Sequence, residues 1–324
     1  MASLKVSVII PVYKVEKYIE KCARSLFEQT LKEIEYIFVD DCSPDNSIKV
    51  LEEVIDQYPD RKSLVRVVRH EKNKGLTTTR NSGIAVAKGE FIAHCDADDW
   101  IEPSMYEEMY ECATMTCSDV VYCDINMVYN NYHEIYKAAS HSIDKIVFIR
   151  NYIASVWTSL CNTLIKSEIY RNNNLCSPEH LCYCEDFWLS VRLFHYANRV
   201  SYIEKPFYNY NRNNGGSITH SLDRKTELEE RKAYLETIDF FKKEGVQNYY
   251  MKEMSWRIIK STHDSVLYSS RYNEFLTIYP ESHKYIWSCP YVNFKCKCIM
   301  SLLHYRVLRP LGIVLIRIRE LLKK

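Results

Sequence analysis

Short apolar runs alternate with predicted helices through the first hundred residues, and this alternation restricts the fold more than any other feature. The apolar runs occupy 6–10, 36–39, 65–68 and 91–95, and the predicted helices lie between them at 19–27, 48–55 and 77–87. Apolar strands separated by amphipathic helices are typical of a parallel sheet covered on both faces. The sequence therefore predicts an α/β fold built on an open sheet.

Acidic side chains follow two of these predicted strands. Asp40 and Asp41 come directly after the second strand, and Asp96, Asp98 and Asp99 come after the fourth. Ligands bind at the carboxyl ends of parallel strands, and carboxylate oxygens suit Mg2+ or Mn2+. The group at 96–99 therefore predicts a metal-diphosphate site. The alternative is a polar turn that caps the next helix.

The sequence lacks the common glycine-rich phosphate loops. It contains only seven glycines, with no G-x-G-x-x-G motif and no phosphate-loop lysine motif. Those motifs surround phosphates with backbone N–H groups. A dinucleotide or ATP loop is therefore not expected, and metal and basic side chains must neutralise any bound phosphate.

Charge and cysteine content limit the compartment and the partners. The overall charge is +1, but the charges are unevenly distributed along the chain. Residues 291–324 contain eight Lys or Arg and one Glu, a local charge of +7, so residues 1–290 carry a net charge of −6. A net acidic body does not favour nucleic acid. No signal peptide is expected before the first strand, and no apolar run approaches the ~20 residues that cross a bilayer. Thirteen cysteines without regular spacing indicate reduced thiols in a cytosol.

Four segments, in order, resemble the family-2 glycosyltransferases with the GT-A fold. They are VSVIIPVY at 6–13, FVDDCSPD at 38–45, NKG at 73–75 with RNSG at 80–83, and GEFI at 89–92 leading into DADD at 96–99. The resemblance covers about the first 105 residues. It implies a Rossmann-like, mostly parallel sheet flanked by helices, here with a C-terminal helical extension, and an inverting transferase that uses a nucleotide-sugar donor.

The resemblance also assigns residues to the donor site. Pro11 and Tyr13 line the base pocket, with Tyr13 stacking on the base, and Asp41 accepts a hydrogen bond from a base ring N–H, which favours a UDP-sugar. Its neighbour Asp40 is either the equivalent residue or a turn former. Arg80 lies beside the nucleotide, or is an exposed cation on a helix.

The metal and the base are assigned in the same way. Asp98 binds Mn2+ or Mg2+ directly, and Asp96 reaches the ribose or a metal-bound water, with Asp99 supporting them. Asp186 removes the proton of the acceptor hydroxyl, a task suited to a carboxylate near the metal, and Glu185 orients it or binds the acceptor. The alternative for this pair is an acidic first turn of a helix, favoured by the helix dipole.

Two positions depart from the family pattern. Cys161 stands where the family often has Trp, which affects an acceptor contact. Arg212 lies one place after the usual Tyr-Arg step, and we predict that it contacts the donor diphosphate. Gly215 and Gly216, in the same loop, are consistent with a movable lid.

A cluster of possible zinc ligands precedes the predicted base. Its members are Cys176, His180, Cys182 and Cys184, without the paired Cys-x-x-Cys of a structural zinc site. Zinc binding is therefore an open alternative to a chance cluster in a cysteine-rich chain.

The expected organisation has three parts. Residues 1–222 form the catalytic domain, with a nucleotide-binding half at 1–100 and an acceptor half at 101–222, and residues 223–290 form a helical extension. Residues 291–324 are a basic amphipathic segment, interrupted at Pro310, that either contacts an anionic membrane surface or packs on the core with a solvated cationic face.

The expected activity is sugar transfer to a hydroxyl of a growing glycan or a lipid-linked acceptor. The resemblance places such enzymes in cell-surface polysaccharide biosynthesis, such as capsule or lipopolysaccharide assembly, in the cytoplasm or peripherally on the inner face of the cell membrane. A sugar nucleotidyltransferase and a catalytically silent nucleotide-sugar-binding protein are the alternative functions.

Overall fold

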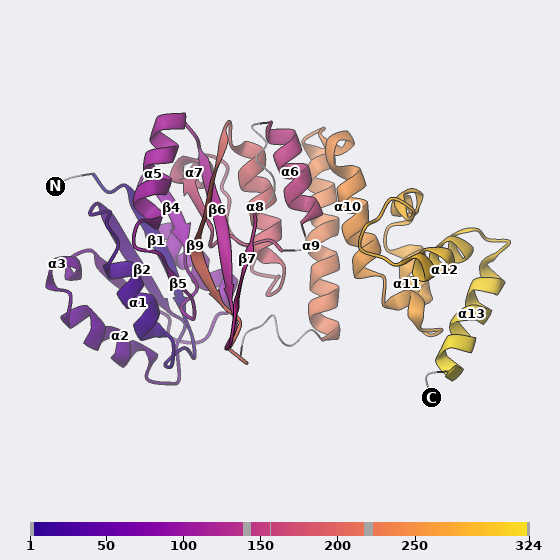
Figure 1. The fold of residues 1–324 in the computed structure, drawn as a ribbon, viewed down its shortest axis with the longest axis horizontal. Helices are drawn as coiled ribbons and strands as arrows, with labels where there is room; N and C mark the ends of the chain where they lie inside the picture. Colours follow the sequence, from indigo (N-terminus) through magenta and orange to yellow (C-terminus); the bar gives the residue numbers. More distant parts are fainter. Residues whose placement is uncertain (1–2, 139–143, 156, 217–222, 323–324) are drawn as a thin grey trace. The chain divides into compact units, whose positions relative to one another are not determined.

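A computed structural model describes residues 3–138, 144–155, 157–216 and 223–322 of the chain (Figure 1). The described residues form two compact units. The first comprises 1–149 and 157–222, and the second comprises 150–156 and 223–324. Residues 217–222, which follow Gly215 and Gly216 of the predicted lid, lie outside the described residues.

The first unit is built on one mixed sheet with strand order β3-β2-β1-β4-β8-β6-β9-β5, and β7 pairs with β6. The first four strands run parallel to one another, whereas β8 is antiparallel to both of its neighbours. The strands are β1 (Val6–Val12), β2 (Ile34–Asp40), β3 (Val65–Arg69), β4 (Phe91–His94), β5 (Trp100–Ile101), β6 (Val120–Val128), β7 (His133–Tyr136), β8 (Thr163–Lys166) and β9 (Val200–Asn211). The GT-A-like α/β fold predicted from the sequence is confirmed.

Helices cover both faces of this sheet (Figure 1). Val8 and Ile10 of β1 belong to the apolar cluster that includes α1 and α5, whereas Ile9 points to the opposite face, towards α4. A Cβ added at Gly83 of α4 would overlap the Ile9 side chain, so this glycine permits the close packing. The helices of the region are α1 (Ile19–Phe27), α2 (Ser47–Asp56), α3 (Pro59–Lys62), α4 (Leu76–Val86), α5 (Met105–Thr116), α6 (Lys145–Ala154), α7 (Ser167–Asn172) and α8 (Glu185–Tyr196).

The second unit is helical, as the sequence predicts for residues after 223. Its helices are α9 (Arg224–Lys243), α10 (Gln247–Ser261), α11 (Tyr272–Thr277), α12 (Phe294–His304) and α13 (Arg309–Leu322). The predicted interruption at Pro310 is wrong in position, because the chain breaks between α12 and α13 at 305–308 and Pro310 lies in the first turn of α13. Proline is tolerated in a first turn, where its missing N–H has no helical partner.

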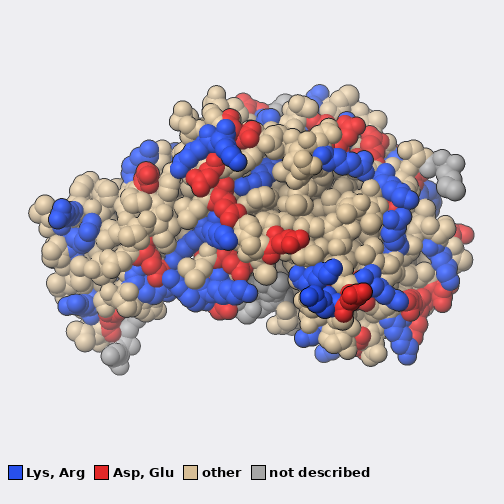
Figure 2. Space-filling model, turned by 180° about the vertical axis from the view of Figure 1, so that it is seen from behind, with Lys and Arg blue, Asp and Glu red and all other residues tan. Residues whose placement is uncertain are grey.

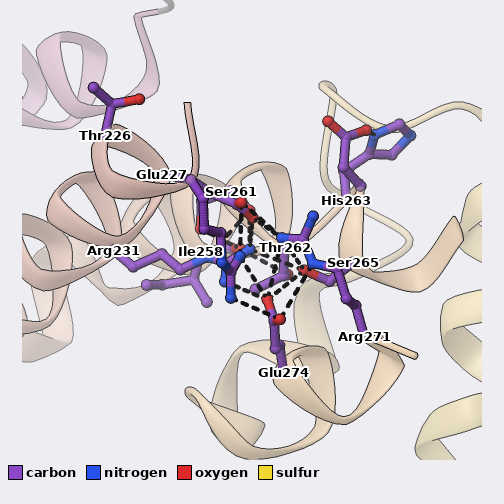
Figure 3. A network of polar contacts seen from close by, with 12 residues as sticks. Thr226, Glu227, Arg231, Ile258, Ser261, Thr262, His263, Ser265, Arg271 and Glu274 are labelled. Atoms are coloured by element: carbon purple, nitrogen blue, oxygen red, sulfur yellow. Dashed lines mark hydrogen bonds and ion pairs between the residues drawn. The ribbon is translucent and has the colours of Figure 1, made fainter. Parts of the chain in front are cut away.

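A network of ion pairs holds α9, α10 and α11 together (Figure 3). The buried Arg231 of α9 donates through Nη1 to Glu274 Oε2 at 2.6 Å and through Nη2 to the Ser261 carbonyl oxygen at 2.7 Å. Arg271 also contacts Glu274, at 3.2 Å. Despite the opposing effect of burial, these hydrogen bonds lower the pKa of Glu274 to about 2. The carboxylate therefore remains charged in the folded unit at neutral pH.

Among the described residues, none of the helices combines the length and the apolar composition that crossing a membrane requires.

Candidate active site

A buried arginine joins three carboxylates from two separate segments of the first unit. Arg80 of α4 is 1% exposed and donates through Nη2 to Asp96 Oδ1 at 3.0 Å. Its Nη1 donates to Glu185 Oε1 at 2.8 Å and to Asp186 Oδ1. These four residues, called here the Arg80 cluster, bring the predicted base beside the predicted metal site. Arg80 is therefore not the exposed helix cation considered as an alternative, and its contact with a nucleotide stays a prediction.

Glu185 and Asp186 occupy the first turn of α8, as the alternative interpretation of this pair also predicted. The preceding residue, Cys184, has a left-handed backbone with φ of 66°, which turns the chain into the helix. Carboxylates are stabilised near the N-terminus of a helix by its dipole. The helix start therefore helps to hold both acids at the sheet edge, where Arg80 and Asp96 meet them.

The two acids of α8 differ in accessibility. The Asp186 side chain is 20% exposed and the Glu185 side chain is 8% exposed. Burial raises the pKa of Glu185 to about 8, with a further increase from Asp186 and a decrease from Arg80. Burial also raises the pKa of Asp186, and Arg80 opposes that effect. Asp186 is thus the acid that an incoming hydroxyl can reach more readily.

The loop at 96–99 is held by residues of β9 and the turn after it. The Tyr208 hydroxyl donates to Asp99 Oδ2 at 2.6 Å and accepts a hydrogen bond from the Asp96 N–H at 3.1 Å. The Asn211 N–H donates to Asp99 Oδ1 at 2.8 Å. Asp99 is buried, and burial raises its pKa well above the usual range. Its contacts stabilise the loop, and a supporting role for Asp99 in metal binding stays a prediction.

Asp98 and Asp96 could hold a divalent cation. Asp98 Oδ2 accepts one hydrogen bond, from Asn214 Nδ2 at 2.8 Å, and burial together with the nearby Asp96 carboxylate raises the pKa of Asp98. No group of three or more His, Cys, Asp or Glu side chains in the described part of the chain is arranged to hold a metal. Mg2+ is usually held by one or two carboxylates, with substrate phosphates and water completing its shell. The pair fits that kind of site.

The ends of β1 and β2 lie side by side at the same sheet edge. Val12 is in register with Asp40, and the Asp41 N–H donates to the Val12 carbonyl oxygen at 3.0 Å. Pro11 is half-buried in β1, and the Tyr13 ring just beyond is 39% exposed. The exposed ring is available for stacking on a planar ligand.

Asp40 and Asp41 have different local roles. Asp40 Oδ1 accepts a hydrogen bond from the Ser43 N–H at 2.8 Å and so stabilises the turn after β2. The buried Asp41 carboxylate accepts from Lys74 N–H at 2.8 Å, from Gly75 N–H at 2.9 Å and makes a 2.8 Å hydrogen bond with His70 Nδ1. A carboxylate offers about four acceptor positions, so about one is left for a base N–H.

The described contacts of Arg212 do not include the Arg80 cluster. The Arg212 guanidinium carbon is 5.7 Å from the centre of the Tyr210 ring, and the Arg212 backbone N–H donates to the Val128 carbonyl oxygen at 2.8 Å. Within the described ranges its guanidinium has no ion pair with a carboxylate. This cation is therefore available to an anionic ligand, although a contact with diphosphate stays a prediction.

Cys161, one of the positions that depart from the family pattern, is buried, and its electrostatic neighbours include Asp96, Arg80 and Asp186. The position therefore borders the Arg80 cluster. Cys176 and Cys182 are exposed, and neither belongs to a described group of three metal-ligating side chains.

Two buried histidines were not identified as site residues from the sequence. His70 links Asp41 to Ser82 Oγ, which lies 2.8 Å from His70 Nε2. His94 at the end of β4 is fully buried, and burial together with Arg80 lowers its pKa to about 3, so the ring is neutral. His70 lies two residues after the third predicted strand, and His94 lies within the fourth. No other sequence signal marked either residue.

The comparisons with known proteins agree with this fold. The family described as glycosyl transferase family 2 matches residues 7–193. The chain is 30% identical over 260 residues to the uncharacterized glycosyltransferase EpsJ of Bacillus subtilis, covering 74% of this chain and 71% of that protein. It is 25% identical over 299 residues to the minor teichoic acid biosynthesis protein GgaB of the same organism, covering 86% of this chain and 32% of that protein.

A solved structure has the same fold. It is that of S. aureus TarS residues 1–349 in complex with UDP-GlcNAc, with a TM-score of 0.68 at 20% identity over 96% of this chain and 90% of that chain. The family match spans more than half of the chain and includes Asp41, Asp96 and Asp186. The chain therefore belongs to glycosyltransferase family 2 and has the GT-A fold.

Proposed function

We propose that this glycosyltransferase moves a sugar from a UDP-sugar to a hydroxyl group of a growing glycan or a lipid-linked acceptor, with inversion at the anomeric carbon. The observation that carries the proposal is the Arg80 cluster, in which Asp96 and Asp186 contact one guanidinium although they are far apart in the sequence. A metal-binding acid and a basic carboxylate must lie close together for direct displacement at one carbon.

Asp186 acts as the general base. It must be ionised to take the proton, and burial alone would disfavour its charged form. Arg80 counters this effect by lowering the pKa of Asp186, and it also fixes Oδ1 in position. The second oxygen, Oδ2, is then the atom that accepts the proton from the attacking hydroxyl.

Glu185 has a different role. Because burial raises its pKa to about 8, this side chain carries a proton for most of the time at neutral pH. A protonated carboxyl can donate one hydrogen bond as well as accept from Arg80. Glu185 therefore orients the cluster or binds an acceptor hydroxyl and is not the base.

Asp98 and Asp96 hold Mn2+ or Mg2+ with the donor diphosphate. When bound, the ion would neutralise the negative charge that gathers on the departing nucleoside diphosphate. Arg212 adds a second positive charge, and its guanidinium is within reach of a ligand because no described carboxylate pairs with it. Asn214 holds Asp98 Oδ2 and so limits the orientations of this carboxylate.

Tyr13, Pro11 and Asp41 bind the base of the donor. The exposed Tyr13 ring stacks on it, and the remaining acceptor position of Asp41 takes the ring N–H of uracil. The backbone N–H groups of Lys74 and Gly75 hold the Asp41 carboxylate in place. A TarS complex with UDP-GlcNAc supports a UDP-sugar donor.

The biological setting we propose is cell-surface polysaccharide biosynthesis, which the relationship to GgaB supports. Residues 1–222 carry out the transfer, with 223–290 as a helical extension, and residues 291–324 contact the inner face of the cell membrane peripherally. Such a contact would bring a cytoplasmic enzyme to a lipid-linked acceptor.

A panel of nucleotide sugars, each tested with Mn2+ for thermal stabilisation and slow hydrolysis, tests the proposal. A ligand that binds the folded state raises the melting temperature. We expect a UDP-sugar to stabilise the chain only with a divalent ion and to be hydrolysed slowly to UDP.

Other outcomes would identify the alternative functions. Pyrophosphate release from a nucleoside triphosphate and a sugar phosphate would indicate a sugar nucleotidyltransferase. Stabilisation by a nucleotide sugar without hydrolysis or transfer to any acceptor would indicate a catalytically silent binding protein. Equal stabilisation with and without metal would refute the proposed role of Asp98.

A further inference from the structure

Helix α13 packs on the second unit through one side only. Gly312 and Ile316 are its buried residues. A Cβ at Gly312 would lie 3.1 Å from Leu303 Cδ2, so the glycine brings α13 close to α12. Ile313 packs against the apolar cluster of the second unit, which includes Leu303 and Ile316. The packed side of α13 is therefore the side that carries Gly312, Ile313 and Ile316.

The opposite side of α13 is apolar and exposed. With 3.6 residues per turn, the centre of this stripe lies about 160° from Ile316. Its side chains are 38–83% exposed, a condition that soluble proteins rarely allow for so many neighbouring large residues. They are Leu311, Val314, Leu315, Ile318, Leu321 and Leu322, called here the α13 stripe.

Arginines flank the α13 stripe, and the one acid of the helix is directed elsewhere. Arg317 and Arg319 lie about 100° to either side of the stripe centre. Arg317 is exposed, whereas Arg319 is half-buried and its Nη1 donates to the Leu267 carbonyl oxygen at 3.0 Å. Glu320 accepts a hydrogen bond from the Ser269 N–H at 2.9 Å, so its carboxylate is directed towards the body of the unit. At the left end of Figure 2, where α13 lies, uncharged atoms form most of the surface, with separate basic and acidic side chains among them.

We propose that α13 docks on bilayers that contain anionic lipids, with the α13 stripe among the acyl chains and the exposed Arg317 at the phosphate groups. An amphipathic helix with cations beside its apolar face binds such a surface. The inference rests on the membrane contact in the proposed function and assigns it to particular side chains.

The charge pattern favours lipid over a second copy of the chain. A symmetric dimer through the α13 stripe would bring Arg317 and Arg319 of one copy towards the same arginines of the other. Like charges at the rim of an interface oppose association. An anionic bilayer supplies the opposite charge beside the exposed Arg317.

The test uses the full-length chain and sedimentation with vesicles of phosphatidylcholine, with and without phosphatidylglycerol. We expect binding to the anionic vesicles that weakens at high salt. The double variant Leu315→Asn/Ile318→Asn should reduce this binding at least tenfold, and Arg317→Gln should reduce the preference for phosphatidylglycerol. Leu228→Asn on α9 is the matched control, because Leu228 is 49% exposed and lies outside the stripe.

Each other result overturns the assignment. Equal binding by the wild type and the double variant would exclude the α13 stripe, and no binding by the wild type would exclude the bilayer. A dimer in solution that the double variant dissociates would identify a second copy as the occupant. Hydrolysis of a UDP-sugar, measured without vesicles, should be the same in the double variant, which separates this inference from the proposed transfer activity.

Discussion

Replacing Arg80 with methionine removes the cation shared by three carboxylates. Arg80 is 1% exposed, and its nearest acidic partners are Asp96, Glu185 and Asp186. Loss of one partner from a buried ion pair costs about 3–5 kcal/mol, because a charge is left without compensation. We therefore predict that Arg80→Met lowers the free energy of unfolding of the first unit by about 3–5 kcal/mol in mildly alkaline solution.

The pH dependence of this loss follows from the sign of the interaction. Arg80 lowers the pKa values of Glu185 and Asp186 in the folded state, so it stabilises their charged forms. Its contribution is present where these groups are ionised and disappears as they take up protons. The difference between wild type and Arg80→Met should therefore be largest at about pH 9 and smaller at about pH 5.

Hydrogen exchange of peptides from β1 and β4 is the suitable assay, because it reports on the first unit without mixing in the second. Arg69→Met is the matched control. Its partner is Glu52, both side chains are more than half exposed, and the loss should stay below about 1 kcal/mol. Adding Asp186→Asn to Arg80→Met should recover part of the stability. A loss no larger than that of Arg69→Met, or one independent of pH, would refute the reasoning.

Three further predictions concern single side chains. The pKa of Glu185 is raised from 4.5 to about 8, so the folded state keeps a proton that the unfolded state releases, and the first unit loses stability as the pH rises from about 4.5 to 8. Glu185→Gln should flatten this decline, and an unchanged stability profile would contradict the pKa assignment. Tyr208→Phe leaves Asp99 Oδ2 and the Asp96 N–H without their Tyr208 partner and should cost about 1–3 kcal/mol in urea unfolding. Tyr110→Phe, which loses an exposed hydrogen bond to Glu90, should cost less, and equal losses would argue against the support role. Glu274→Gln should lower the stability of the second unit by up to about 3 kcal/mol at neutral pH. The difference in stability between wild type and variant should shrink as the pH falls from 4.5 towards 2, because Glu274 then takes up a proton. A constant difference across that range would show that the charge of Glu274 is not the cause.

The first half of the fold follows from local sequence patterns. The strands β1 to β4 and the helices between them lie within a few residues of the predicted ranges, because an apolar strand and an amphipathic helix each have a period that the sequence displays. The acids at 96–99 and at 40–41 lie at one edge of the sheet for the same reason. Neither result requires knowledge of contacts between distant residues.

The burial of Arg80 could not be read from the sequence. Its partners Glu185 and Asp186 are more than a hundred positions away, and no local period indicates that a polar residue in α4 faces inwards. The same holds for Tyr208 and Asn214, whose roles depend on how β9 passes the loop at 96–99. Long-range polar contacts are specified by the folded backbone and not by spacing along the chain.

The C-terminal segment was predicted in part. The apolar and basic residues at helical spacing correctly indicated helices. The packing interpretation fits one side of the last helix, and membrane contact of the other side stays a prediction. Ile316 is packed on the core, whereas Leu315 and Ile318 are exposed. Pro310 was expected to interrupt the helix, but it lies in the first turn of α13, where a proline is tolerated.

The most direct test of the account compares Asp98→Ala with Asp186→Asn in UDP binding and in sugar transfer, both with Mn2+. Asp186→Asn should bind UDP with an affinity close to that of the wild type and transfer sugar at least a hundredfold more slowly, within the range of ~10²–10⁴ for a lost general base. Asp98→Ala should lose the metal-dependent part of UDP binding. Wild-type turnover in either variant, or metal-dependent UDP binding that survives in Asp98→Ala, would contradict the assignment of metal site and base.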